Sequence, residues 1–526
     1  MNGIVYARLT PFKGFTFTGR FGYKLEQRDQ PGILSVPYYF SDRLKYDYYS
    51  FSVNENSHNG YQADASAEYS FIKGGHDLNA KAGFYYENTS LVSRKGSGFT
   101  ENTAIGPDDI NIETTELGFS DLAFFAQAGY TFGDRYGIQA SFRADKFQSP
   151  NILAEEFSWC FFPTISAGWT ISNEPFFKNN VSRNAISRLA VKASWGKGGS
   201  TSDYETFSYA FLNSGFETSD HLNIGIETSL FKNRLNIIAD WFQKKTENIP
   251  FYASNTIYAV HSSVMNSGVD VEMSWYDRIG DFSYGISGNF STLNNEVMPL
   301  GDGNENISRL TVGYSSDGVK TAYETGMPMW YLYGYSADTK FENYDYWEMT
   351  YLGQGIPTMY YGTSINLAYK GFDLYVSGYG TAGNSIANCI FSPVSGIKNI
   401  IKDFLGEEWQ EYGQYKSQSG AVVFDGSFFR IKQLQLGYTI PERLTRKIFI
   451  QNARVFVSLD DWFTFSSYPC GDPETATTGT RMTNSIYSPL NAFIEQVPYG
   501  TDRQLGIDYG SYPMSKKLIF GLSIRF

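Results

Sequence analysis

The printed sequence ends on Lys516-Lys517-Leu518-Ile519-Phe520-Gly521-Leu522-Ser523-Ile524-Arg525-Phe526, and this stretch decides the fold class. Its apolar side chains fall on every second position and comprise Leu518, Phe520, Leu522, Ile524 and Phe526. The positions between them hold Gly, Ser, Arg and a single Ile. Successive side chains of a β-strand point to opposite faces. The stretch therefore predicts a strand whose apolar face lies against lipid or a protein core.

The same alternation recurs through the chain and pairs into hairpins across tight turns. The alternating segments lie at residues 15–25, 62–71, 78–87, 122–132, 136–142, 222–230, 235–241, 269–275, 282–290, 365–369 and 372–376. They predict strands of about ten to thirteen residues, a length that crosses a bilayer at a tilt. Strands of soluble sandwiches are usually about five or six residues long. An all-β fold, a transmembrane antiparallel β-barrel, is therefore predicted.

The composition is consistent with this fold class. Aromatic residues make up 17% of the 526 residues, yet the mean hydropathy is −0.32. No run approaches the roughly 18 apolar residues of a membrane helix. Alternating lipid-facing strands give this combination because every second residue is polar. Composition alone leaves open a large secreted all-β protein, such as a sandwich array or a propeller.

Short and long connections alternate along the chain. The short turns lie near residues 11–14, 73–76, 133–135, 232–234, 278–281 and 370–371. The long connections lie near residues 27–59, 88–118, 147–159, 198–220, 247–264, 295–358, 385–427 and 464–515. Outer-membrane barrels have short periplasmic turns and long extracellular loops. Pro441 predicts a brief helical turn at 441–452, and apolar spacing predicts one short helix at 397–405.

The polar strand faces would line the lumen of such a barrel. Their charged residues are Arg20, Asp64, Glu68, Lys81, Arg143, Lys192, Glu227, Asp240, Asp270 and Glu272. These residues would wet the interior or contact a plug, and some would touch substrate. Aromatic residues in the long connections would stack on sugar rings or pack the loops against one another or a lipoprotein; they are Trp330, Tyr331, Tyr333, Tyr335, Trp347 and Trp409.

Charge and motifs argue against several other functions. The net charge of −12 argues against a nucleic-acid partner, because neutralising phosphates needs an excess of basic residues. The three cysteines and four histidines follow no metal-ligand or catalytic spacing. Asp460 and Asp461 are neighbours on an expected strand and would point to opposite faces, which rules out a glycosidase pair. Residues 302–306 match a calcium loop incompletely. We therefore expect no enzyme activity, no cofactor and no metal site.

Several segments together resemble the SusC/RagA branch of TonB-dependent outer-membrane transporters. One is residues 426–441, GSFFRIKQLQLGYTIP, followed by ARVFVS at 453–458 and LDDWFTF at 459–465. Family members then tend to carry Gly-Tyr-Asp-Pro-Glu, and this chain keeps Asp472-Pro473-Glu474. Residues 161–169, residues 189–196 and Tyr512-Pro513 also match in type and order. The resemblance covers nearly the whole chain, and a terminal strand that ends in Phe resembles the assembly signal of bacterial outer-membrane barrels.

The resemblance implies import of a large nutrient, such as an oligosaccharide or a peptide, across the bacterial outer membrane. It implies outer-membrane lipid, a SusD-like surface lipoprotein, the TonB complex acting through a plug, and the barrel assembly machinery as partners. The assembly signal would comprise Leu518, Phe520, Leu522, Ile524 and Phe526. A passive pore or a surface adhesin barrel without energised transport is the alternative.

The expected strands number about 17, and no second domain is expected. The first strand (about residues 3–10) and the last both run toward the short-turn side, which gives an odd count. Single-chain bacterial barrels have even counts, and transporters of this kind have 22 strands around a plugged lumen. Residues 1–526 are therefore expected to form the C-terminal portion of a barrel, without the plug and the N-terminal strands.

Overall fold

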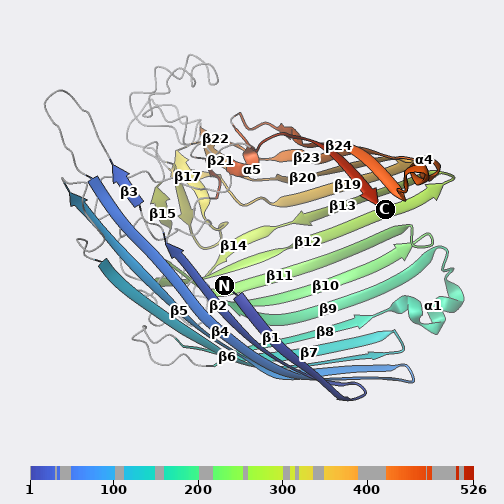
Figure 1. Cartoon of the computed structure of the whole chain (residues 1–526), viewed down its shortest axis with the longest axis horizontal. Helices are drawn as coiled ribbons and strands as arrows, with labels where there is room; N and C mark the ends of the chain where they lie inside the picture. Colours follow the sequence, from blue (N-terminus) through green and yellow to red (C-terminus); the bar gives the residue numbers. More distant parts are fainter. Residues whose placement is uncertain are drawn as a thin grey trace. The chain divides into compact units, whose positions relative to one another are not determined.

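The computed structural model describes residues 2–29, 32–35, 49–100, 112–148, 159–200, 217–252, 259–299, 309–313, 319–335, 349–388, 422–469, 471–476, 505–508 and 514–525. Nearly all of the regular structure in these residues is antiparallel β-strand (Figure 1). The chain divides into two compact units, with residues 1–167 forming most of unit 1 and residues 217–526 most of unit 2. No helix of the described residues is long and apolar enough to span a membrane.

Unit 1 is a meander of long strands. Its strands are β1 (Asn2–Phe12), β2 (Phe15–Asp29), β3 (Gly32–Ser35), β4 (Tyr49–Lys73), β5 (His76–Thr100), β6 (Ile112–Phe132), β7 (Tyr136–Gln148) and β8 (Cys160–Trp169). The short turns at 13–14, 74–75 and 133–135 fall where the sequence predicts them. Gly14 (φ 86) shows why one turn needs glycine, because a Cβ there would lie 2.3 Å from the Ser70 carbonyl oxygen.

The strands of unit 1 are longer than predicted. Both β4 and β5 have 25 residues, and they stay paired from the Lys73–His76 end to the Tyr49–Thr100 end. The prediction of loops throughout 27–59 and 88–118 is therefore wrong. Backbone hydrogen bonds can pair two strands without an apolar face where the hairpin extends beyond lipid. The alternation of apolar and polar residues therefore ends before the strand does. Glu55 and Arg94 mark this extension with an exposed ion pair at 2.7 Å.

The main sheet of unit 2, which we call the wall, also consists of antiparallel strands. They are β9 (Ile186–Ser200), β10 (Glu217–Leu230), β11 (Leu235–Tyr252), β12 (Ala259–Ile279), β13 (Phe282–Thr292), β14 (Asn294–Met298), β19 (Met359–Tyr369), β20 (Phe372–Ala382), β23 (Phe428–Thr439), β24 (Asn452–Ser466) and β26 (Lys517–Arg525). With β3 and β14 counted as short extensions, the described residues hold seven long strands in unit 1 and ten in unit 2. This agrees with the predicted count of about 17.

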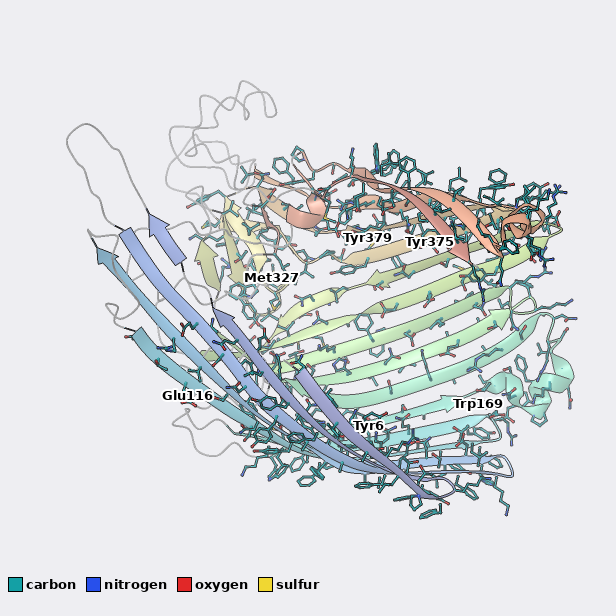
Figure 2. The ribbon with its side chains drawn as sticks, in the orientation of Figure 1. Tyr6, Glu116, Trp169, Met327, Tyr375 and Tyr379 are labelled. Carbon is teal, nitrogen blue, oxygen red and sulfur yellow. The ribbon has the colours of Figure 1, made fainter. Side chains whose placement is uncertain are left out.

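One register row shows how the alternation builds the wall. Ile286 pairs with Ile365 and Ile365 with Val376, and the row continues through Leu434, Leu459 and Leu518. The next row contains Asn366, Tyr375, Gln435 and Ser458. Tyr375 and Tyr379 lie along β20 (Figure 2). Apolar residues thus occupy one face of the wall across β13 to β26, and polar residues occupy the other.

Short helices occupy two connections at the short-turn end of unit 2. The first has η2 (Ile171–Asn173) and α1 (Pro175–Asn180). The second has α4 (Glu442–Thr445) and η6 (Arg446–Ile448), directly after Pro441. The predicted helical turn at 441–452 is therefore confirmed. The helix predicted at 397–405 lies outside the described residues.

The long connections of unit 2 are more ordered than predicted, and we call their described segments the cap. It comprises residues 309–313, 319–335, 349–353, 385–388, 422–425 and 505–508, with β15 (Leu310–Gly313), β16 (Lys320–Tyr323), β17 (Tyr331–Tyr335), β18 (Met349–Gly353), β21 (Ser385–Asn388), β22 (Val423–Asp425) and β25 (Ile507–Asp508). Strands β15 to β18 form one antiparallel sheet. Strand β21 pairs with β22 in antiparallel and with β25 in parallel fashion.

The cap has a hydrophobic core of its own. Val319, Leu332, Ala387, Val422 and Ile507 pack together, and four of them have no exposed surface. They come from connections that are distant in the sequence. Burying such side chains is worth about 1.5–3 kcal/mol for each large aliphatic residue. The cap is therefore a packed structure whose connections hold one another.

A second cluster joins the cap to the wall of unit 2. Val264 of β12 and Val297 of β14 pack with Tyr323 and Trp330 of the cap. The Tyr323 hydroxyl also hydrogen-bonds the Ser262 hydroxyl of β12, and burial raises the pKa of Tyr323 to about 12. The cap is thus anchored to the strands that carry it.

Candidate functional site

A buried charge with several partners is Arg430 of β23. Its side chain is 2% exposed. The pairing of β23 shifts register between Ile431 and Gln433 against β24, and β20 shifts opposite the same place. A β-bulge changes the direction of nearby side chains. The irregularity therefore allows the charged residues Arg430 and Lys432 to occupy an otherwise regular wall.

Arg430 donates from each of its three guanidinium nitrogens. Nε donates to Thr464 Oγ1 of β24 at 3.0 Å, and Nη1 donates to Glu474 Oε2 at 2.5 Å. Nη2 donates to Asp472 Oδ1. A buried guanidinium is stable only when its charge and donors are matched in this way. We call Arg430, Asp472 and Glu474 the clamp.

The contacts of the clamp explain why the Asp-Pro-Glu element occurs at residues 472–474. Asp472 accepts the Glu474 backbone N–H at 3.0 Å, which caps the short helix α5 (Pro473–Ala476). Pro473 occupies the first helical position, where its missing N–H costs nothing. Asp472 also accepts the Met514 backbone N–H at 3.1 Å. The element thus ties the segment after β24 and the segment before β26 to Arg430.

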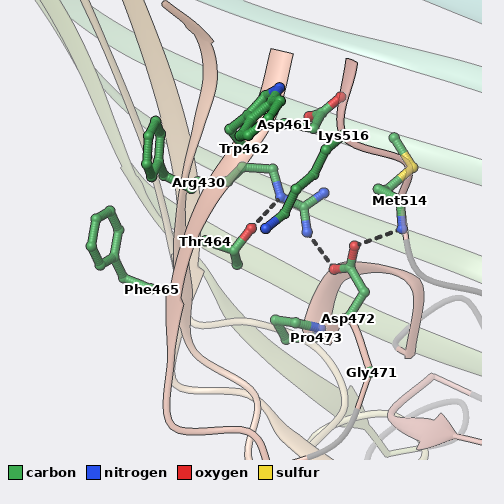
Figure 3. A pocket seen from close by; sticks show the side chains of 11 residues that line it. Arg430, Asp461, Trp462, Thr464, Phe465, Gly471, Asp472, Pro473, Met514 and Lys516 are labelled. Carbon is green, nitrogen blue, oxygen red and sulfur yellow. Dashed lines mark hydrogen bonds and ion pairs between the residues drawn. The ribbon is translucent and has the colours of Figure 1, made fainter. Parts of the chain in front are cut away.

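A pocket of about 320 Å³ lies beside the clamp (Figure 3). It is lined by Arg430, Asp461, Trp462, Phe463, Thr464, Phe465, Gly471, Asp472, Pro473, Met514 and Lys516. Lys516 lies 6.0 Å from the centre of the Trp462 ring. The size is within the usual range of ligand pockets. The walls offer an aromatic surface and charges of both signs, which suits non-covalent binding.

The alternation expected for Asp460 and Asp461 does not hold in β24. Asp461 has φ 61, and its side chain accepts Lys432 Nζ at 2.8 Å while remaining 1% exposed. Asp460 accepts the Ser458 hydroxyl at 2.5 Å. The prediction that regular strand geometry separates the two carboxylates is wrong at this bulge, where backbone geometry departs from the period of two. Lys432 holds Asp461 as an ion pair.

Many charges predicted to line the lumen form ion pairs within their own unit. Arg20 contacts Asp64 at 3.0 Å in unit 1. In unit 2, Lys192 bridges Asp240 at 3.1 Å and Glu227 at 3.4 Å. Glu68 lies opposite Lys81 in the register of β4 and β5, and Arg143 contacts Asp145 at 2.6 Å. Asp270 and Glu272 lie on β12 opposite Asp240 and Ile238. The ion pairs of Arg20, Lys192 and Arg143 therefore join charges on the polar face within each unit.

The aromatic residues of the cap divide into packed and accessible ones. Trp330 and Tyr331 are 5% and 1% exposed and therefore pack the cap. Tyr333 and Tyr351 are opposite each other on β17 and β18, and both keep exposed surface. Tyr335 is partly exposed. Trp347 and Trp409 lie outside the described residues.

An ion pair holds the first strand of the cap. Arg309 Nε donates to Glu324 Oε2 at 2.8 Å and to the Tyr331 hydroxyl at 3.1 Å. These hydrogen bonds from Arg309 hold the pKa of Glu324 below its usual value. Burial and the hydrogen bond to Glu324 raise the pKa of Tyr331 to about 12. Glu324 therefore remains ionised at neutral pH.

The last strand has the geometry that the sequence predicts. Leu518, Phe520, Leu522 and Ile524 share one face of β26 and are 42–77% exposed. Their partners on β24 are Leu459, Val457, Val455 and Ala453. Phe526 lies outside the described residues. Their role as an assembly signal stays a prediction.

Candidate chemistry is sparse in the part of the chain that the structure describes. No group of three or more His, Cys, Asp or Glu residues there is arranged to hold a metal ion. Cys160 is partly buried at the start of β8, whereas Cys389, Cys470 and residues 302–306 fall outside the described residues. Sequence reasoning did not predict the clamp, although Arg430 and the Asp-Pro-Glu element both stand in segments that carry the family resemblance.

A wall with one apolar, exposed face and one polar face of paired charges defines a transmembrane β-barrel of the outer-membrane type. The family model described as "TonB dependent receptor-like, beta-barrel" matches residues 5–453. The chain belongs to this family and is an outer-membrane protein. Its members are receptors and transporters.

Relatives and solved structures agree with this assignment. The chain is 25% identical to TonB-dependent receptor P3 of Formosa agariphila, covering 79% of this chain and 46% of the relative. It is 19% identical to TonB-dependent receptor SusC of Bacteroides thetaiotaomicron, covering 77% and 44%. The chain thus spans about half the length of these curated relatives.

Two solved structures show the same fold. The RagAB peptide importer in the open-open state aligns with a TM-score of 0.76 at 18% identity, covering 100% of this chain and 60% of that chain. The ferric citrate transporter FecA aligns with a TM-score of 0.52 at 10% identity, covering 88% and 56%. At these identities the likeness concerns the fold alone.

Proposed function

We propose that this chain supplies the barrel of a SusC-like importer that takes up a large nutrient, such as an oligosaccharide or a peptide, across the outer membrane. The observation that carries the proposal is the packed cap, because a receptor that selects a large substrate needs ordered loops above its lumen. The cap core and the clamp keep such loops in place. The likeness in fold between this chain and the RagAB peptide importer supports the same class.

Energised import needs more than a barrel wall. We propose that a plug inside the lumen, linked to the TonB complex, drives transport, and that a SusD-like surface lipoprotein covers the cap. Residues 1–526 form the C-terminal barrel portion in this proposal. The apolar face of β26, comprising Leu518, Phe520, Leu522 and Ile524 with Phe526 after it, directs insertion by the barrel assembly machinery.

Uptake by whole cells tests the proposal. Cells that carry the intact gene should accumulate a labelled oligosaccharide or peptide mixture, and a deletion strain should not. Collapse of the proton gradient should stop uptake in the first strain. Uptake of every polymer tried at the same rate in both strains would contradict the proposal.

A passive pore is the competing function, and it makes a different prediction. Liposomes that contain the purified protein should swell in small sugars without any energy source if the lumen is open. The packed cap and the paired charges of the polar face favour a closed resting state. Rapid swelling of these liposomes would favour the pore.

A further inference from the structure

The short-turn end of unit 2 differs in charge from the rest of the chain. The whole chain has 42 basic and 54 acidic residues. Residues 170–185, 231–234, 280–281, 370–371 and 440–451 together hold eight basic and three acidic residues. Barrel orientation places these short connections on the periplasmic side. An acidic protein therefore carries a basic rim at this end.

Exposed aromatic side chains accompany the basic residues on this rim. Phe449 is 91% exposed, Phe176 is 56% exposed and Phe231 is 49% exposed. The Phe231 ring lies 5.9 Å from the ring of Trp275, whose strand position belongs to the apolar face of β12. The rim is thus continuous with the face that meets lipid. Aromatic residues in such a place favour the boundary between headgroups and acyl chains.

The backbone at Phe449 adds an independent observation. Phe449 has φ 61 and ψ 23, which is the left-handed conformation. A bulky residue rarely adopts this conformation, and a retained outlier points to a role for its side chain. The conformation ends η6 and leaves the ring outside the packed protein. Arg443, Arg446 and Lys447 precede it within six positions, and Arg446 also forms an exposed ion pair with Glu442 at 2.6 Å.

We propose that residues 440–451 form an interfacial anchor in the periplasmic leaflet of the outer membrane. Phe449 lies at the boundary of headgroups and acyl chains, and Arg443, Arg446 and Lys447 bind the phosphodiester groups of anionic phospholipid. Basic residues next to a membrane surface attract anionic lipid, and paired guanidinium donors match phosphate oxygens. The anchor concerns lipid binding and is independent of what the barrel imports.

Depth measurement tests the position of Phe449. A nitroxide is attached to Phe449→Cys in the full chain with Cys160, Cys389 and Cys470 changed to Ser, and the protein is placed in nanodiscs with phosphatidylglycerol. The label should be more accessible to oxygen than to a water-soluble nickel chelate. Asn233→Cys is the matched control, because Asn233 is exposed and has a similar φ of 65; its label should favour the nickel chelate. Equal nickel access at both sites would overturn the proposal.

Lipid retention tests the charges. The variant Arg443→Gln/Arg446→Gln/Lys447→Gln should retain less phosphatidylglycerol in native mass spectrometry, by about fivefold for each charge removed. Lys245→Gln, a substitution in β11 toward the long-connection end, should leave retention unchanged. Unchanged retention in the triple variant would overturn the proposal. The proposal would also be overturned if the nitroxide on Phe449→Cys became shielded from the nickel chelate only after addition of periplasmic extract, because the occupant would then be a protein.

Discussion

Units 1 and 2 continue their strands beyond the membrane in different ways. In unit 1, β4 and β5 simply extend to 25 residues each, and exposed pairs such as Glu55 with Arg94 mark the extension. In unit 2, the connections fold into the cap, where Leu332 and Ile507 have no exposed surface. A repeating wall therefore does not determine which structure its long connections form.

The two solutions depend on different forces. Extended hairpins rely on backbone hydrogen bonds between strands that follow each other in the sequence. The cap relies on apolar burial between distant segments and on one buried set of charges, the clamp. We therefore expect truncation of an apolar side chain to destabilise the cap more than it destabilises the strand extensions of unit 1.

Removal of Arg430 should have the largest effect. Arg430→Met leaves Asp472 buried without its partner, which should cost about 3–5 kcal/mol in urea unfolding of the protein in lipid vesicles. The variant Arg430→Met/Asp472→Asn/Glu474→Gln removes the uncompensated charge and should recover most of the loss. Equal destabilisation of both variants would show that the clamp matters for packing and not for charge.

Truncation of the cap core should come next. Leu332→Ala should destabilise the cap by about 2–5 kcal/mol, because it leaves a cavity among fully buried neighbours. The control Val92→Ala lies in the β5 extension, where Val92 is only partly buried, and should change stability by about 0.5 kcal/mol. Limited proteolysis of the cap segments and urea unfolding measure the difference. Similar losses for the two variants would remove the contrast between the units.

A pair of arginine substitutions tests the two faces of the wall. Ile365→Arg places a charge in the apolar row of β19 and should cost about 2–4 kcal/mol, which prevents assembly. Asn366→Arg, one residue later on the polar face, should be tolerated because that position stays wet. Heat-modified migration on gels reports folding of each variant. Assembly of both proteins in equal amounts would contradict the assigned faces.

Acid should loosen the first strand of the cap slightly. Hydrogen bonds from Arg309 lower the folded-state pKa of Glu324 below its ordinary value of 4.5. The stability it contributes is therefore present above about pH 4.5 and is lost as the pH falls through the lowered pKa. Amide exchange of residues 309–313 should accelerate in that range. Glu324→Gln should abolish the pH dependence, and its persistence in this variant would assign it to another group.

The sequence predicts the wall well because the wall is local and periodic. The apolar row through Ile365 and Leu518 follows from alternation alone. The cap was not predictable in this way. Val319 and Ile507 belong to one hydrophobic cluster although they are far apart in the sequence, and neither stands in an alternating segment. Strand ends were misjudged because pairing continues after the apolar face ends.

The site was predictable only in part. Both Arg430 and Asp472 stand in segments that carry the family resemblance, but 42 positions separate them and no pattern links them. The β-bulge at Lys432 also lacks a signal in the alternation, because a single inserted residue looks like ordinary variation. Contacts between separate connections need the folded structure.

Hydrogen exchange at the parallel pair of β21 and β25 tests directly whether the cap is one packed structure. Ala387 donates its N–H to the Gly506 carbonyl at 2.7 Å, and both segments belong to the cap core. If the cap is one packed structure, peptides that contain residues 385–388 and 505–508 should exchange as slowly as those from β19 and β20, and Arg430→Met should accelerate them. Exchange of these cap peptides within seconds in the unaltered protein, while β19 and β20 stay protected, would contradict the account.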